Sequence, residues 1–265
     1  MTAKHAIITG GSSGIGLAVA KRLASTGWQI TLIARNTERL NQAVLSLNIP
    51  QERIQQYAVD VTDQNTLNQS IAQSIETFGT PNLLVTSAGI AHPGHFQELE
   101  SEVFQQAMAI NYFGTLYAVQ AVAPSMRKGN NGHIVMISSG AALIGVYGYS
   151  AYCPSKFAVR GLAEVLRAEF KPDGVNVSIV YPPDTQTPQL EQENKTKPNE
   201  TFAISGNAKT WEADNVAKII IKGIEKNQFS ITPGLEMTAL ERLGSLINPL
   251  LQRYFDSLVR KVRKQ

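Results

Sequence analysis

The stretch Thr9-Gly10-Gly11-Ser12-Ser13-Gly14-Ile15-Gly16 decides the fold. An apolar run, His5 to Thr9, leads into it, and a helical pattern with Leu17, Ala20 and Leu23 on one side follows at once. A glycine-rich turn between a strand and a helix leaves backbone N–H groups and the positive end of the helix dipole free to hold a diphosphate. A glycine turn without a ligand is the alternative, but the flanking strand and helix favour a phosphate cradle. We expect the cradle to be formed by Gly10, Ser12, Ser13, Gly14, Ile15 and Gly16.

Short β-branched runs alternate with longer helical patterns along most of the chain. This alternation is typical of βα units built around a parallel sheet. We predict strands at residues 5–9, 29–34, 55–59, 83–87, 133–138, 175–181 and 229–232. Helices are expected at residues 14–25, 37–47, 64–78, 101–126, 151–170 and 213–226. The expected fold class is α/β, a single doubly wound Rossmann-type domain with a mainly parallel seven-stranded sheet and C-terminal amphipathic helices.

The segment 182–210 departs from this alternation. It is rich in Pro, Gln, Glu, Asn, Lys and Thr, lacks apolar periodicity, and is too long for an ordinary connection. We therefore expect it to form a lid over the substrate. The catalytic domain is placed at residues 1–232, with the lid included, and a C-terminal helical extension at residues 233–265.

The composition is that of an ordinary globular protein of one domain, with 265 residues, 43% hydrophobic and 17% charged. The single cysteine, Cys153, excludes an intramolecular disulfide, and the start lacks the apolar stretch of a secretory signal, so we expect a cytoplasmic protein. No run approaches the roughly 18 apolar residues of a spanning helix. The net charge of +3 is too small to suggest nucleic-acid binding. The histidines, His5, His92, His95 and His133, are too dispersed to predict a metal site.

The residue that follows the second predicted strand selects the nicotinamide cofactor. An acidic side chain at this place would accept hydrogen bonds from the ribose 2′-hydroxyl of NAD. Here the sequence reads Ile33-Ala34-Arg35-Asn36, so a guanidinium is available to pair with a 2′-phosphate. We therefore expect NADPH/NADP+ as the cofactor. The alternative is that Arg35 is only a solvated surface charge.

Tyr152 and Lys156 are the candidate acid/base pair. They are four residues apart at the start of a predicted helix, so their side chains share one face. A tyrosine with a pKa of about 10 is a poor base near neutral pH, and a nearby ammonium favours its phenolate form. Without further context, a half-buried aromatic and a solvated amine would be the more ordinary interpretation of this spacing.

The order of motifs between residues 3 and 231 resembles that of the short-chain dehydrogenase/reductase family. The matching elements are TGGSSGIG at 9–16, Asp60-Val61, Ser87-Ala88-Gly89, Asn111, Ser139, and Tyr152 with Lys156. The resemblance implies that Ser139 binds the substrate oxygen and that Tyr152 transfers the proton. It further implies that Lys156 holds the nicotinamide ribose and lowers the tyrosine pKa, with Asn111 supporting a water relay to Lys156.

The same resemblance implies contacts to the rest of the cofactor. Asp60 and Val61 would flank the adenine, while Ala88 and Gly89 would let the backbone pass close to the cofactor. Two positions depart from the family pattern, because Ser87 replaces a common asparagine and Asp184 replaces a glycine. The second change puts a standard backbone contact to the nicotinamide amide in doubt, and we expect its contacts to come from Pro182, Thr185 and Thr187.

Within that family, three segments resemble the 3-ketodihydrosphingosine reductases, namely residues 181–188, 191–198 and 255–260. This resemblance implies a long-chain 2-amino-3-ketone substrate, reduced at C3 to dihydrosphingosine. Asp184, Glu191 or Glu193 would then be available to pair with its ammonium group, although most charged loop residues are simply solvated. Two alternatives stay open: a reductase of another lipid, steroid or retinoid carbonyl, and a non-catalytic NADP(H)-binding sensor or scaffold.

The C-terminal segment predicts an amphipathic helix. Asn248 and Pro249 are expected as its N-cap and first residue. Its apolar positions, Leu250, Leu251, Tyr254, Phe255, Leu258, Val259 and Val262, follow helical spacing, and basic residues flank them. An upstream amphipathic pattern runs through Met237, Leu240, Leu243 and Ile247. These helices either lie peripherally on an anionic membrane surface or cover the pocket or a subunit interface.

The family resemblance also implies a homodimer or homotetramer, formed through the helices expected at 101–126 and 151–170. The remaining partner is a small lipid-like ketone, with no nucleic acid and no metal.

Overall fold

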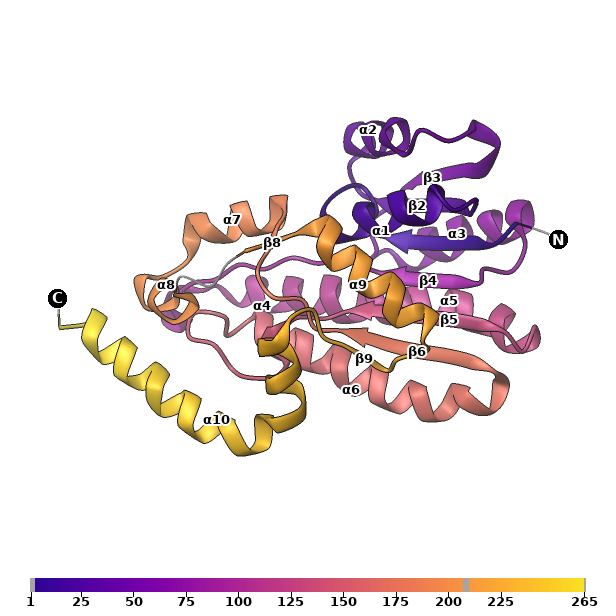
Figure 1. Cartoon of the computed structure of the whole chain (residues 1–265). Coiled ribbons are helices and arrows are strands. Elements are labelled where there is room, and N and C mark those ends of the chain that lie inside the picture. Colours follow the sequence, from indigo (N-terminus) through magenta and orange to yellow (C-terminus); the bar gives the residue numbers. More distant parts are fainter. Residues whose placement is uncertain (1–2, 207–209, 265) are drawn as a thin grey trace.

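A computed structural model of the chain describes residues 3–206 and 210–264. Its centre is a sheet of seven strands, all parallel, in the order β3-β2-β1-β4-β5-β6-β9 (Figure 1). The strands are β1 (His5–Thr9), β2 (Gln29–Ala34), β3 (Ile54–Ala58), β4 (Leu83–Thr86), β5 (Gly132–Ile137), β6 (Val175–Val180) and β9 (Ser230–Ile231). Every predicted strand end lies within one residue of the observed one, and the predicted fold class is confirmed.

The strands read as continuous apolar runs because helices cover both faces of the sheet. All residues of β1, β4 and β5 are buried, as expected for parallel strands enclosed on both sides. One face packs against α1 (Gly14–Ala24), α2 (Thr37–Leu47) and α9 (Ala213–Glu225). The other packs against α3 (Gln64–Phe78), α5 (Gly114–Lys128) and α6 (Tyr152–Phe170).

The chain order reverses between β1 and β4. From β1 the chain runs outward through β2 and β3 on one side, and β4 then returns to pair with the other edge of β1. In open parallel sheets, such a reversal leaves a crevice at the carboxyl ends of the strands, where ligands bind. The glycine turn 10–16 follows β1 at this crevice.

The prediction of one uninterrupted helix at 101–126 was wrong. The structure has α4 (Ser101–Ala107), a π-helical segment η3 (Met108–Phe113) and then α5. The wider turn carries Asn111 inward, where its amide bonds Ile90 and Ser155. It also leads into Gly114, where an added Cβ would lie 2.5 Å from a methyl group of Val61. π-Turns of this kind are frequent at functional sites.

The segment 182–210 contains regular structure that its lack of apolar periodicity did not predict. It holds β7 (Thr185–Gln186), α7 (Pro188–Thr196) and α8 (Asn199–Ser205). β7 pairs with β8 (Trp211–Glu212) in a second small parallel sheet. Part of the predicted lid, 207–209, lies outside the described residues.

The C-terminal extension is a single helix, α10 (Leu235–Val262), and not the two helices that the sequence predicted. Asn248 is therefore not an N-cap, and Pro249 lies inside the helix. The side chain of Asn248 instead donates a hydrogen bond of 3.2 Å to the Leu143 carbonyl, which fixes the helix to the body of the domain. α10 runs past α8 and away from the sheet (Figure 1). Within the described ranges, no helix is both long and apolar enough to cross a membrane.

Candidate active site

A cavity of about 660 Å³ lies at the carboxyl ends of the strands. It is built from the β1–α1 turn, the segments after β4, β5 and β6, the start of α6, and residues of α7, α8 and α10. The predicted site residues that line it are Gly10, Ser12, Ser13, Gly14, Ile15, Arg35, Val61, Ala88, Gly89, Ser139, Tyr152, Lys156, Pro182 and Thr185. Its volume is that of an ordinary small-molecule site.

The glycine turn has the geometry of an anion cradle. Gly10 has φ +68°, and a Cβ there would lie 2.5 Å from the backbone N of Ala88. Gly16 does not line the cavity, but a Cβ on it would lie 2.5 Å from the Gly10 carbonyl oxygen, so it permits the turn to close. In the described structure the α1 N-terminus has no side-chain cap and no acidic residue in its first turn. Its free N–H groups and positive dipole end therefore fit the diphosphate of a nicotinamide cofactor.

Arg35 lies at the predicted cofactor-selecting position, at the edge of the cavity. Its side chain is 58% exposed, and its guanidinium lies 3.6 Å from the Asp60 carboxylate. An exposed pair at this distance is weak, so it does not prevent Arg35 from binding another anion. Asp60 itself does not line the cavity and accepts hydrogen bonds from Thr62 instead. Its predicted contact with adenine stays a prediction.

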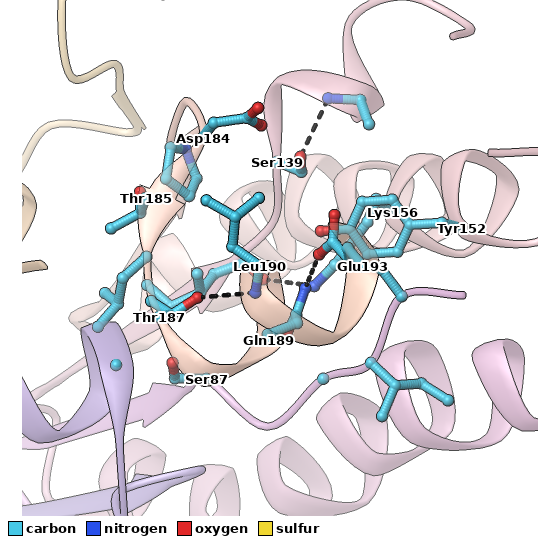
Figure 2. Close-up of a pocket in the computed structure, with 18 of the residues that line it drawn as sticks. Ser87, Ser139, Tyr152, Lys156, Asp184, Thr185, Thr187, Gln189, Leu190 and Glu193 are labelled. Atoms are coloured by element: carbon cyan, nitrogen blue, oxygen red, sulfur yellow. Dashed lines mark hydrogen bonds between the residues drawn. The ribbon is translucent and has the colours of Figure 1, made fainter. Parts of the chain in front are cut away.

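Tyr152, Lys156 and Ser139 come together at one wall of the cavity (Figure 2). The Lys156 Nζ lies 5.6 Å from the centre of the Tyr152 ring and donates a hydrogen bond of 3.1 Å to the Ile137 carbonyl. The Ser139 Oγ accepts a hydrogen bond of 3.1 Å from the Ala141 backbone N. Its neighbour Ser138 points the other way and donates to the carbonyl of Lys156, which ties β5 to α6.

Burial dominates the ionisation of these groups. It lowers the pKa of the Lys156 ammonium to about 8, an effect that the Glu193 carboxylate opposes. Burial and the same carboxylate raise the pKa of Tyr152 above its ordinary value, whereas hydrogen bonding with Ser139 and Gln189 acts to lower it. The pKa of Tyr152 is therefore raised, whereas the resemblance implied that Lys156 would lower it. The raised pKa keeps the phenol neutral, which is the form that can give a proton to a ketone oxygen.

Asn111 lies behind the cavity wall and does not line it. Its Oδ1 accepts from the Ile90 N at 2.8 Å, and its Nδ2 donates to the Ile90 carbonyl and to Ser155 Oγ. A Cβ added to Gly89 would lie 3.1 Å from this Oδ1 and 3.5 Å from the Lys156 Nζ. Asn111 and Lys156 thus border the same small space, and the water relay between them stays a prediction.

The two departures from the family pattern lie close to the cavity. Both Ser87 and Asp184 line it. The Ser87 backbone N donates to the Thr9 carbonyl, and the exposed Asp184 uses its carbonyl to accept from Trp211. Thr187, which lines the cavity, caps α7 through a hydrogen bond from the Leu190 N.

Several lining residues were missed at the sequence level. Arg39 lies one helical turn after Arg35, and this spacing of two arginines was a readable signal. Tyr149 and Gln189 carried no such signal, because each is a polar residue in a segment without periodicity. Three apolar lining residues from separate parts of the chain were missed as well: Ile144, Val146 and Ile204. Met237, Leu240 and Phe255 also line the cavity, in agreement with the alternative that the amphipathic C-terminal segment covers the pocket.

Comparisons with known proteins agree with this geometry. The family model described as short chain dehydrogenase matches residues 4–198. A Dictyostelium discoideum protein named 3-ketodihydrosphingosine reductase is 39% identical over 97% of this chain and 82% of its own length. The mouse protein of the same name is 41% identical over 93% of this chain and 76% of its own length.

Two solved structures have the same architecture. ElxO with NADP bound is 29% identical with a TM-score of 0.77, covering 88% of this chain and 98% of its own. A short chain dehydrogenase/reductase from Burkholderia phymatum in complex with NAD is 24% identical with a TM-score of 0.82, covering 94% and 95%. The chain belongs to the short-chain dehydrogenase/reductase family, whose members use nicotinamide cofactors.

Proposed function

We propose that the chain reduces the C3 ketone of 3-ketodihydrosphingosine to the secondary alcohol of dihydrosphingosine, with NADPH as the reductant. The observation that carries the reaction is the convergence of Tyr152, Lys156 and Ser139 beside the glycine turn, in one cavity. The relatives named 3-ketodihydrosphingosine reductase, which match most of the chain, support the choice of substrate.

Ketone reduction requires a hydride, a proton for the carbonyl oxygen, and a hydrogen-bond donor that stabilises the negative charge developing on that oxygen. When bound, NADPH supplies the hydride. The Tyr152 hydroxyl donates a proton to the carbonyl oxygen, and the Ser139 hydroxyl donates a hydrogen bond to that oxygen as negative charge develops on it. The Lys156 ammonium stabilises the phenolate that Tyr152 leaves behind and offers donors to the nicotinamide ribose.

The charges at the edge of the cavity support NADPH over NADH. Arg35 and Arg39 both line this edge, and Asn36 between them caps α2 by accepting from the Arg39 N at 2.8 Å. Two guanidinium groups held at a helix N-terminus favour a 2′-phosphate, because charge-assisted hydrogen bonds to phosphate are strong and often bidentate.

Part of the cavity lining is apolar and supports a long apolar substrate. Ile144, Val146 and Ile204 line the cavity, as do Met237, Leu240 and Phe255 of α10. Turnover of 3-ketodihydrosphingosine with NADPH, measured beside steroid, retinoid and short-chain ketones, is the test. Good activity on another ketone and none on 3-ketodihydrosphingosine would end the assignment of substrate. NADPH binding without turnover of any ketone would favour a non-catalytic sensor.

We propose that α10 also rests on the cytosolic surface of an anionic membrane. One side of the helix lines the cavity, while Leu246, 73% exposed, and its neighbours Leu243, Leu250 and Tyr254 face outward. Arg253 and Arg260 flank this stripe and would meet anionic headgroups, each contributing about 1 kcal/mol near such a surface. A lipid substrate would then pass along α10 into the cavity.

Flotation with vesicles tests this contact. The wild type should float with anionic vesicles, and a Leu246→Glu, Leu250→Glu double variant should not, because carboxylates replace the apolar stripe. Equal flotation of both proteins would remove the membrane proposal.

We further propose a homodimer or homotetramer formed through η3, α5 and α6. Phe113, Phe157 and Val165 are exposed large apolar side chains on these helices. A Phe157→Arg substitution should shift the sedimentation coefficient toward that of the monomer. A monomeric wild type would refute the assembly.

A further inference from the structure

Glu193 is a carboxylate buried inside the active-site cavity. It belongs to α7, lines the cavity, and is only 7% exposed. Its Oε2 accepts a hydrogen bond of 2.8 Å from the Tyr149 hydroxyl, and its Oε1 accepts one of 2.8 Å from the Gln189 Nε2. Both oxygens are therefore held in a fixed direction.

No cation in the described part of the chain pairs directly with this carboxylate. The ion pairs found within 4.0 Å all involve other residues. Burial raises the pKa of the Glu193 carboxyl, and the nearby Lys197 charge only partly opposes this. The Lys197 Nζ lies over the rings of Tyr149 and Phe202, at 6.0 and 5.5 Å from their centres. A buried carboxylate without a contacting cation destabilises the fold, so this one is a natural place for a cationic ligand.

The carboxylate lies next to the group that reacts. The Tyr149 ring that holds it is 5.6 Å from the Tyr152 ring. Gln189, its other partner, lines the same cavity as Tyr152. Figure 2 shows Glu193 and Gln189 of α7 facing the wall that carries Tyr152 and Lys156. A ketone oxygen at Tyr152 and Ser139 therefore places the adjoining carbon atoms of the substrate close to Glu193.

We propose that Glu193 binds the ammonium group of a substrate whose amine stands on the carbon next to the ketone, with Tyr149 and Gln189 orienting the carboxylate. An amine in that position is two covalent bonds from the carbonyl carbon, about 2.5 Å away, so it comes close to Glu193 when the oxygen meets Tyr152 and the amine-bearing carbon faces α7. The inference rests on the proposed function and makes Glu193 the residue that selects a 2-amino-3-ketone. The other acidic candidates fit less well, because Asp184 is exposed and Glu191 lies outside the cavity.

Two ketones and two variants test the assignment. The ketones are 3-ketodihydrosphingosine and the same chain with hydrogen in place of the amine. The preference is the ratio of their kcat/KM values. Glu193→Gln keeps the shape of the side chain and removes its charge, and it should lower the preference at least about 30-fold, as expected for loss of a buried charge pair. Glu191→Gln, a change of the same kind on the exposed side of α7, should leave the preference unaltered.

A second variant and a binding measurement guard against a misfolded Glu193→Gln protein. Tyr149→Phe keeps the charge but frees the carboxylate, and it should lower the preference by a smaller factor. Calorimetry with NADP+ present should show dihydrosphingosine binding more weakly to Glu193→Gln, with binding of the amine-free alcohol little affected. If both variants retain the wild-type preference, the role of Glu193 is refuted while the proposed reaction stands. If the wild type reduces neither ketone, the proposed function itself fails.

Discussion

Replacing Lys156 by methionine should make the cofactor-free protein more stable at neutral pH, although it removes a group needed for turnover. Lys156 is 5% exposed, and burial lowers its pKa from 10.5 to about 8. The difference between these values corresponds to about 3 kcal/mol of destabilisation while the ammonium is charged. Methionine removes this cost but leaves the Ile137 carbonyl without its 3.1 Å donor, which costs about 1–2 kcal/mol. The expected net gain is about 1–2 kcal/mol.

The pH dependence gives the sign of the effect. Because the folded pKa is lower than the unfolded one, the unfolded chain binds the proton more tightly. The cost of Lys156 is therefore complete below pH about 8, shrinks as the pH rises toward 10.5, and disappears above it. Burial raises the pKa of the neighbouring Tyr152, so its phenol stays neutral in this range and does not offset the change at Lys156. The advantage of the Lys156→Met variant should thus be largest near neutrality.

Urea unfolding followed by tryptophan fluorescence measures this difference at about pH 7 and about pH 10. Lys218→Met is the matched control, because Lys218 is exposed on α9 and its loss should change the free energy of unfolding equally little at both pH values. A gap between wild type and Lys156→Met that is the same at both pH values would refute the argument. A variant clearly less stable than the wild type at pH 7 would refute it as well.

Three further predictions concern the proton, the cofactor and the glycine turn. Tyr152→Phe should lower kcat roughly 100- to 10,000-fold with little change in the Kd for NADPH; stopped-flow turnover and fluorescence titration check this, and nearly normal kcat would exclude Tyr152 as the proton donor. Arg35→Asp should reduce the preference for NADPH over NADH roughly 100-fold in kcat/KM, and an unchanged preference would show that Arg35 is a surface charge. Gly16→Ala should cost about 1–3 kcal/mol of stability because its Cβ would meet the Gly10 carbonyl. Gly145→Ala, where the space is open and the backbone is not left-handed, should instead gain up to about 1 kcal/mol, and equal melting temperatures of these two glycine variants would contradict the steric argument.

The sheet and the cofactor half of the site could be predicted because local pattern and burial agree there. Each strand is an apolar run that the structure buries on both faces, and the glycine turn follows β1 directly. Tyr152 and Lys156 were placed on one helical face by their spacing, and both line the cavity. In these segments the apolar residues are buried and the glycines lie in the turn, so the residue type alone predicts the position.

The long helices were harder because tertiary contacts decide their continuity. Pro249 has the features of a helix start, since it lacks an N–H and follows a good capping residue. In the structure Asn248 is used differently, because its amide bonds the Leu143 carbonyl while α10 continues through the proline. The π-turn at η3 was hidden for a similar reason: the bonds that stabilise it join Asn111 to Ile90 and Ser155, which are distant in sequence.

In the substrate half of the site, Glu193 could be identified from the sequence only as one of three acidic candidates, for a more general reason. α7 has a signal for its start, Thr187 as a cap with Pro188 behind it, but it lacks an apolar stripe because its inward residues, Gln189 and Glu193, face a polar part of the cavity. A polar residue that faces a ligand looks the same in sequence as one that faces solvent. Its burial is what separates the two, and a charge kept below one-tenth exposure, as in Glu193 and Lys156, is retained against its cost in stability. A buried charge that also lines the cavity, as Glu193 does, is therefore where substrate selection is expected to reside, which is why Glu193 ranks above the exposed acidic residues beside it.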